Sequence, residues 1–409
     1  MKVNKYLPFA FVYFFFNTVA LPHGLTFTAL LAPFFYGWVM LVRKQEVLLP
    51  FLALLAPFLI LHVSVVGVEE SSYFLSLLNL VLVYIFCQAA YTFFLQCRDP
   101  ERIFYRVIQV NFFLCLLAIP FYFTPWFSFF WDEQDITNGV GRLRRLRLFT
   151  YEPSYYAFLF IPFFFFFLLQ YFFAQNKVRG IYLLPMIILP LLLSFSLGVM
   201  ASVLLACLFT GLVYFGRLAR KRRVAWFVGG TGGVMVFVLA FLLLFFRHNA
   251  IFIRIANILA GKDTSGNGRT VDAFVIGLKI AREKSEYWGI GLGQIKLVGD
   301  DIIRKYYLYN MDLVVTIPNA TAETLAIFGW AGVGLRMLIE FFFFFYTRVW
   351  TNYYRLLLFF FVFIYQFTGS FITNAAEYVI WIMAFTNCFR QFDVPVAQAR
   401  VRPLLRSTF

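Results

Sequence analysis

The sequence predicts an all-α, polytopic membrane protein with about twelve transmembrane helices. The chain of 409 residues is 62% hydrophobic and only 13% charged, which is far more apolar than a soluble domain of this length requires. Apolar segments of roughly 20 residues, the length that crosses a bilayer as a helix, recur along the chain. We therefore expect residues 1–409 to form a single integral-membrane domain.

Twelve apolar segments are predicted to be spanning helices. They cover residues 6–22, 25–42, 47–67, 73–96, 105–124, 154–174, 181–197, 199–216, 224–246, 319–346, 356–373 and 375–390. The first follows Met-Lys-Val-Asn-Lys, as in a signal peptide, but it has no small-residue cleavage site and is interpreted as a helix. The phenylalanine runs 163–167 and 341–345 are expected to face lipid tails.

The distribution of basic residues predicts that both termini are cytoplasmic. With that orientation, most of the 35 Lys and Arg residues fall in cytoplasmic segments, where positive charge is favoured. The short outer loops near 22–24, 67–72, 198 and 374 contain none. The net charge of +15 is therefore interpreted as anchoring by anionic membrane lipid, and nucleic-acid binding is not expected.

Two outer loops break this pattern, and both are basic. The large outer loop, 247–318, is long enough to escape the charge rule, whereas the first outer loop, 125–153, is short. The short loop contains four arginines: Arg142, Arg144, Arg145 and Arg147. Charge held on this side indicates an anionic ligand such as a phosphate. The alternative is local compensation in a solvated loop by its four acidic residues: Asp132, Glu133, Asp135 and Glu152.

The large loop is predicted to contain two helices. Apolar residues recur at helical spacing over 269–286, which predicts an amphipathic helix with Asn267 as its N-cap. Arg269 would lie in its first turn, where free backbone N–H groups also attract anions. A glycine-rich aromatic turn follows over 287–293 without the spacing of a nucleotide loop, and a second helix is expected over about 299–310.

Several side chains are candidates for chemistry. Glu152 precedes Pro153 at the start of an apolar run, so it is a helix cap, a general base or a residue that orients the arginines. The adjacent Tyr155 and Tyr156 are either interfacial residues or stack on sugars. Among the charged residues of the tenth span, Glu323 is a stronger candidate for a site residue than Arg336 or Glu340.

Arg336 and Glu340, four residues apart in the tenth span, are expected to form an ion pair near its cytoplasmic end. Five cysteines and three histidines show no ligand spacing, so no metal, cofactor or disulfide framework is expected.

Arg147-Leu-Phe-Thr-Tyr-Glu152-Pro153-Ser154-Tyr155 is similar to an R-x-x-x-x-E-P-S-Y element. It is the first of four motifs that resemble those of the O-antigen polymerases (Wzy-type), which are integral-membrane proteins related to O-antigen ligases. Ser194-Phe-Ser196-Leu197-Gly198 resembles the polymerases' S-x-S-R-G hairpin, with Leu at the Arg position. The other two similar segments are Gly268-Arg269 with Trp288-Gly-Ile-Gly291-Leu-Gly293, and Pro318-Asn319 followed by Gly329 and Gly332.

The resemblance implies a GT-C-like membrane glycosyltransferase of the bacterial cytoplasmic (inner) membrane. It implies polymerisation of undecaprenyl-diphosphate-linked oligosaccharide repeats on the periplasmic face, for lipopolysaccharide or a related surface polysaccharide, without a metal. A chain-length regulator and a flippase are the implied partners. Arg147 and Arg269, with Arg145 and Arg142, would bind the diphosphate, and Glu152 or Glu323 would act as base.

Two other functions stay open. An O-antigen ligase would transfer the finished glycan to lipid A–core. That branch has a presumed base, a histidine, at the position of Pro318, which favours the polymerase. A lipid-linked oligosaccharide flippase or other transporter is the candidate from another class. The absence of an obvious internal repeat and the concentration of charge in outer loops argue against transport.

Overall fold

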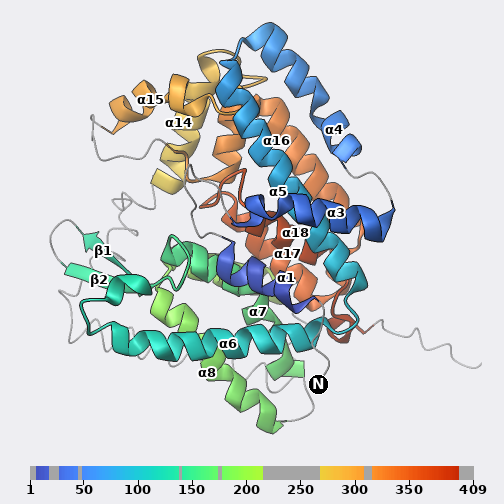
Figure 1. The fold of residues 1–409 in the computed structure, drawn as a ribbon, viewed down its shortest axis with the longest axis vertical. Helices are drawn as coiled ribbons and strands as arrows, with labels where there is room; N and C mark the ends of the chain where they lie inside the picture. Colours follow the sequence, from blue (N-terminus) through green and yellow to red (C-terminus); the bar gives the residue numbers. More distant parts are fainter. Residues whose placement is uncertain are drawn as a thin grey trace, which may run out of the picture.

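A computed structural model describes residues 6–17, 27–44, 48–137, 141–173, 177–214, 268–307 and 316–395 of the chain. The described part is mostly helical, and its ribbon is drawn in Figure 1. Five helical segments are long and apolar enough to cross a membrane: Leu48–Val66, Glu70–Gln96, Pro100–Phe121, Pro153–Phe173 and Ala320–Thr351. The chain is therefore a membrane protein, while the count of twelve spans stays a prediction.

Helices occupy all the predicted spanning segments except 224–246, which lies outside the described residues. The helices of these segments are α1 (Leu7–Phe11, continued by the π-helix Val12–Phe16), α2 (Phe27–Leu30), α3 (Ala32–Arg43), α4 (Leu48–Leu61, continued by the π-helix His62–Val66), α5 (Glu70–Gln96), α6 (Pro100–Phe121), α7 (Pro153–Phe173), α8 (Lys177–Ser194), α9 (Leu197–Val213), α16 (Ala320–Tyr346), α17 (Tyr353–Tyr365) and α18 (Ala375–Phe385). Short 3-10 turns lie at Phe127–Phe129, Val349–Thr351 and Arg390–Phe392.

Buried asparagines set the starts of three C-terminal helices. Asn319, Asn352 and Asn374 are the N-caps of α16, α17 and α18, and each side chain accepts a backbone N–H of the first turn. Helix α6 instead begins with Asp99 as N-cap and Pro100 in its first turn. Such caps satisfy N–H groups that the surrounding helix cannot pair, which defines where each helix begins.

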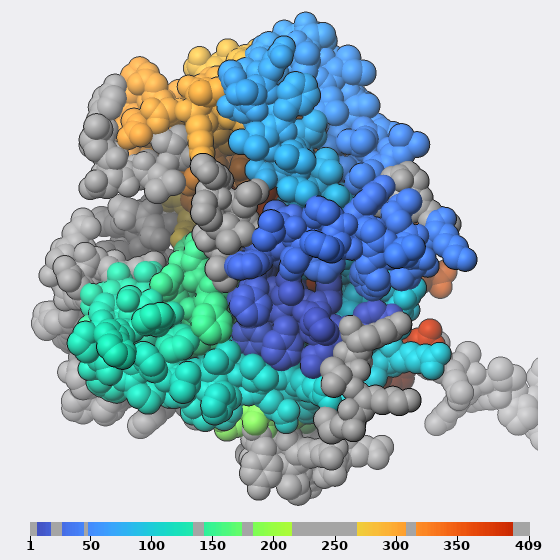
Figure 2. All heavy atoms as spheres, viewed as in Figure 1, coloured from blue at the N-terminus to red at the C-terminus, as the bar shows by residue number. Residues whose placement is uncertain are grey.

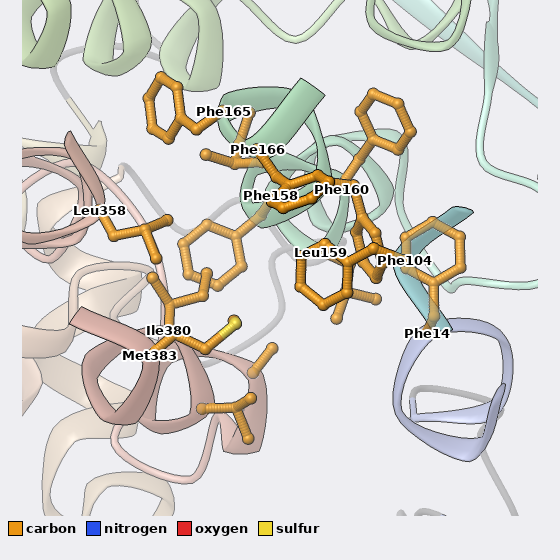
Figure 3. Close-up of a cluster of buried hydrophobic side chains, with 14 of the residues drawn as sticks. Phe14, Phe104, Phe158, Leu159, Phe160, Phe165, Phe166, Leu358, Ile380 and Met383 are labelled. Atoms are coloured by element: carbon orange, nitrogen blue, oxygen red, sulfur yellow. The ribbon is translucent and has the colours of Figure 1, made fainter. Parts of the chain in front are cut away.

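Helix α7 is the centre of the largest core. Its phenylalanines Phe158, Phe160, Phe165 and Phe166 are fully buried, and they meet residues of the π-helix Val12–Phe16, α6, α17 and α18 (Figure 3). The expectation that the run 163–167 faces lipid is therefore wrong. The run 341–345 in α16 behaves as expected, because most of its rings are exposed on the surface.

The large loop contains both helices that the sequence predicts. The amphipathic helix is α14 (Val271–Arg282), with Thr270 at its N-cap position, and the second is α15 (Ile295–Tyr306). Asn267, the predicted cap, lies outside the described residues. Helix α14 packs on α16, and the yellow and orange residues of this loop lie beside the blue α4–α5 region in Figures 1 and 2.

The short basic loop folds as a β-hairpin, which corrects the all-α prediction. Strands β1 (Trp131–Thr137) and β2 (Gly141–Leu146) pair antiparallel. Their register places three acidic residues opposite three arginines, in the pairs Asp132–Arg145, Glu133–Arg144 and Asp135–Arg142. Opposite charges facing each other across strands stabilise the pair, so this alternation favours a hairpin over an open loop.

Helix α16 is broken at Gly329, where the backbone leaves the helical conformation with a φ of 64°. The glycine-rich turn of the large loop docks in this break. Ile290 and Gly291 donate N–H groups to the carbonyls of Ala326 and Ile327, at 3.0 Å each. In return, Trp330 and Ala331 donate to the carbonyls of Glu286 and Tyr287, at 3.1 Å each.

The glycines of this turn allow the two backbones to touch. A Cβ on Gly289 would lie 2.2 Å from the Ile327 carbonyl oxygen, and a Cβ on Gly329 would lie 2.3 Å from the Tyr287 carbonyl. Both glycines also have positive φ. These contacts and hydrogen bonds fix the large loop to α16, whose N-cap is Asn319.

Candidate functional site

An ion pair joins the segment before α7 to the segment before α14. Arg269 Nη2 lies 3.0 Å from Glu152 Oε1, although the two residues are 117 positions apart in the sequence. The Arg269 side chain is 34% exposed and that of Glu152 is 24% exposed. The pair therefore stays in contact with solvent at the start of α7, where a ligand can compete for either partner.

The Glu152 carboxylate is bound by two side chains. It accepts the Arg269 guanidinium and the Ser154 hydroxyl, the latter at 2.5 Å. The Thr150 hydroxyl donates to the Glu152 carbonyl oxygen and so fixes the backbone of the turn. Within the described part of the chain, the hydrogen bonds of this carboxylate go to side chains, not to the first amides of α7.

Asn319 places Arg269. Its fully buried side chain donates from Nδ2 to the Arg269 carbonyl oxygen at 2.8 Å and to the Phe367 carbonyl oxygen at 2.6 Å. The pKa of the Arg269 guanidinium is raised: burial works to lower it, but the Glu152 carboxylate and two neighbouring tyrosines outweigh burial. Arg269 is therefore a fixed cation at the junction of the large loop, α7 and α16.

Two tyrosines that the sequence analysis did not select complete the surroundings. Tyr151 and Tyr365 lie within electrostatic range of Arg269, and Tyr365 is also within range of Glu152 and Arg145. Tyr151 is 45% exposed, whereas Tyr365 is buried against Phe158. A signal for Tyr365 existed, because Tyr365-Gln366 interrupts an otherwise apolar run.

The arginines of the hairpin are placed differently from the prediction. Arg147, predicted as the diphosphate ligand closest to Glu152, directs its guanidinium to the carbonyls of Ser128 and Thr150, at 2.8 and 3.3 Å. Arg144 contacts Glu133 and the rings of Tyr122 and Phe127. Both side chains brace the hairpin, because they contact carbonyls and rings of the hairpin segment and of the end of α6.

Arg145 lies nearer than Arg147 to the arrangement expected of a diphosphate-binding residue. It is buried, and its Nε donates to the Ser194 carbonyl oxygen at 3.0 Å, in the turn between α8 and α9. Its charge also acts on Tyr365, beside the Glu152–Arg269 pair. For Arg142 only the backbone is described. It lies near the start of β2, opposite Asp135.

The predicted sugar-stacking residues belong to the core. Tyr155 and Tyr156 are 8% and 1% exposed. The Tyr155 hydroxyl donates to Asn374 at 2.7 Å, and the Tyr156 hydroxyl donates to Asn111 at 2.9 Å. The stacking prediction is wrong for this conformation, because both rings are covered; the exposed aromatic ring next to Glu152 is that of Tyr151.

Glu323 does not join Glu152 in the described contacts. It lies one turn into α16, and its Oε2 accepts the backbone N–H of Ile372 at 2.7 Å. Glu323 thus holds the α17–α18 connection, whereas Glu152 is the carboxylate that pairs with Arg269. In the part of the chain that the structure describes, no group of three or more His, Cys, Asp or Glu side chains is arranged to hold a metal.

No protein-family profile matches the chain, and no curated protein matches it significantly.

Proposed function

We propose that this protein is a membrane glycosyltransferase of the bacterial inner membrane that polymerises undecaprenyl-diphosphate-linked oligosaccharide repeats on the periplasmic face. The observation that carries the proposal is the contact between Glu152 and Arg269. These residues belong to two of the four segments that resemble polymerase motifs, and the fold brings them together. The proposal includes a GT-C-like arrangement, twelve spans and cytoplasmic termini.

The chemistry requires a cation for the leaving group and a base for the acceptor. A sugar hydroxyl of the acceptor attacks the anomeric carbon of the donor chain, a C–O bond forms, and the bond to the lipid diphosphate breaks. Arg269 would stabilise the departing diphosphate through its planar, permanently charged guanidinium. As Arg269 turns to the diphosphate, Glu152 is released to accept the proton of the attacking hydroxyl.

Arg145 supports the same proposal. The turn Ser194–Gly198 resembles a family hairpin that has an arginine where this chain has Leu197. In the fold, Arg145 reaches this turn from the hairpin and contacts the Ser194 carbonyl. We propose that Arg145 provides the second guanidinium for the diphosphate, and that Arg147 and Arg144 keep the hairpin in place.

A deletion strain tests the reaction. If the protein polymerises repeats, surface lipid of the deletion strain carries a single repeat, and the ladder of longer chains is absent. Expression of the wild-type chain restores the ladder. A bare lipid core with long chains still on the carrier lipid would identify a ligase instead. Accumulation of unpolymerised repeats on the cytoplasmic side would identify a flippase.

A further inference from the structure

A long groove lies between the apolar helices, apart from the ion pair of the proposed site. Its volume is about 770 Å³, and residues of α4, α5, α16 and α18 line it. Ring contacts show how these helices run: Phe58 lies 5.3 Å from Phe328 between ring centroids, and Phe51 lies 4.1 Å from Tyr84. The groove therefore begins near the break in α16 and extends toward the C-terminal ends of α5 and α16.

The middle of the groove has no spare positive charge. The predicted Arg336–Glu340 ion pair is confirmed here, with Arg336 Nε 3.1 Å from Glu340. The same guanidinium also donates to Gln366 at 2.7 Å and contacts Glu377 of α18. Because two carboxyl groups face this one guanidinium, Arg336 is committed to partners inside the protein. The rest of the wall is mainly apolar.

The end of the groove toward the C-terminus of α5 is polar and basic. Gln88 and Tyr91 line it, and Arg43, the last residue of α3, reaches both of them. Arg43 Nη1 donates to Gln88 at 2.7 Å, and its guanidinium carbon lies 5.2 Å from the centre of the Tyr91 ring. Lys44 follows and is exposed. In the described part of the chain, neither basic side chain forms an ion pair.

One carboxylate also lies at this end of the groove. Asn387 lines the groove and donates to Asp393, which also accepts a hydrogen bond from Asn352. A further exposed cation, Arg348, follows the groove-lining residue Thr347. With the two basic residues at the end of α3, the positive charges at this end outnumber the single carboxylate.

We propose that this groove binds one anionic phospholipid of the bilayer, with its acyl chains along α4, α5 and α16 and its phosphate at Arg43 and Lys44. These three helices belong to segments that are long and apolar enough to cross a membrane, so the groove is accessible to lipid. Its apolar wall favours acyl chains, and its basic end favours an anionic headgroup. The volume falls within the roughly 300–1,000 Å³ of pockets that hold one ligand.

The position of the charges distinguishes this lipid from the carrier lipid of the proposed reaction. That carrier would place its diphosphate at Arg269, which is bound by Asn319 at the start of α16. The groove begins one turn later, at Thr324, and its basic residues lie at the opposite end. The lipid site is therefore independent of the glycosyltransferase assignment.

Native mass spectrometry of the full-length protein with phosphatidylglycerol and phosphatidylcholine of identical acyl chains tests the proposal. The wild-type protein should retain one phosphatidylglycerol and bind phosphatidylcholine at least fivefold more weakly. Arg43→Gln should weaken phosphatidylglycerol binding about fivefold, which is the contribution of one basic residue near an anionic headgroup. Arg98→Gln is the matched control, because Arg98 is exposed just beyond α5 and contacts none of the described groove residues. It should bind both lipids as the wild-type protein does.

A second variant tests the acyl-chain part of the site. Leu54 lines the groove and is 46% exposed, so Leu54→Trp adds bulk to the groove without disturbing the core. It should weaken the binding of both lipids to the same extent. Unchanged binding by Leu54→Trp would show that the chains lie elsewhere and would overturn the proposal.

Three other results would also overturn it. The wild-type protein would bind the two lipids equally, Arg98→Gln would lose as much affinity as Arg43→Gln, or undecaprenyl diphosphate would displace phosphatidylglycerol at equal concentration. The last result would assign the groove to the carrier lipid. The comparison of the two lipids on the wild-type protein requires no substitution, so it decides the question even if a variant does not fold.

Discussion

Two arginine–glutamate sites of this protein differ chiefly in their access to water. The Glu152–Arg269 pair is 24% and 34% exposed, whereas Arg336 and its two carboxylate partners are all nearly buried. A water-accessible pair costs little to open, because solvent or an incoming anion replaces the lost partner. A buried cluster cannot open at low cost. The first arrangement is suited to exchange a partner with a substrate, and the second to hold helices together.

The largest expected effect comes from removal of the buried cation. Arg336→Met should destabilise the protein by roughly 3–5 kcal/mol, because two buried carboxyl groups lose their partner. Thermal unfolding in detergent measures this. The matched control is Arg282→Met, since Arg282 is 60% exposed and also pairs with a glutamate four residues away. Equal losses in the two variants would contradict the contrast between buried and exposed pairs.

The glycine contact between the large loop and α16 should be the next most sensitive. Gly289→Ala is expected to cost about 2 kcal/mol or more, because its φ is +75° and its new Cβ would collide with the Ile327 carbonyl. Gly334→Ala is the control, since a Cβ at Gly334 meets nothing within 4 Å. A melting temperature of Gly289→Ala no lower than that of the control would show that the docking is adjustable.

Opening the exposed pair should hardly change stability. Arg269→Ala is expected to alter the unfolding free energy by about 1 kcal/mol or less, as for other solvent-accessible ion pairs. The same thermal assay compares this variant with Arg336→Met. A loss as large as that of Arg336→Met would mean that Arg269 is a structural residue, and the functional assignment would lose its basis.

The smallest effect concerns a fully exposed carboxylate. Hydrogen bonds from Ser71 and Ser72 lower the pKa of Glu69, the N-cap of α5, to about 2. Because this folded-state pKa is below the unfolded value of about 4.3, the stabilisation is present above the unfolded pKa and is lost as pH falls toward 2. Glu69→Gln should therefore flatten the acid side of the melting-temperature profile; an unchanged profile would contradict this.

The pattern of apolar segments predicted most helices, but it did not predict their surroundings. The two phenylalanine runs have the same composition, yet 163–167 is in the core and 341–345 is on the surface. Burial depends on which helices pack around a segment, and an apolar run has no polar face that would reveal it. In contrast, the sequence periodicity of α14 was sufficient to place that helix, because one of its faces is polar.

The candidate site was predictable only in part. Glu152 and Arg269 were both selected from the sequence, but their contact depends on Asn319 and on the docking of the glycine turn, neither of which a linear pattern contains. Arg147 was selected because it is near Glu152 in sequence, but its two terminal guanidinium nitrogens donate to the backbone carbonyls of Thr150 and Ser128. The hairpin was missed because its acidic and basic residues were counted without a strand register.

The measurement that most directly tests the central claim is the glycan ladder of a deletion strain that expresses Arg269→Ala at the wild-type level. Arg336→Lys, which retains the buried positive charge, and Arg282→Ala, an exposed arginine of the same loop, serve as controls. The account predicts that Arg269→Ala reduces chain elongation by about 10²-fold, as expected for loss of one group that stabilises a leaving anion. It also predicts that Arg282→Ala restores the full ladder. A full ladder from Arg269→Ala would contradict the account.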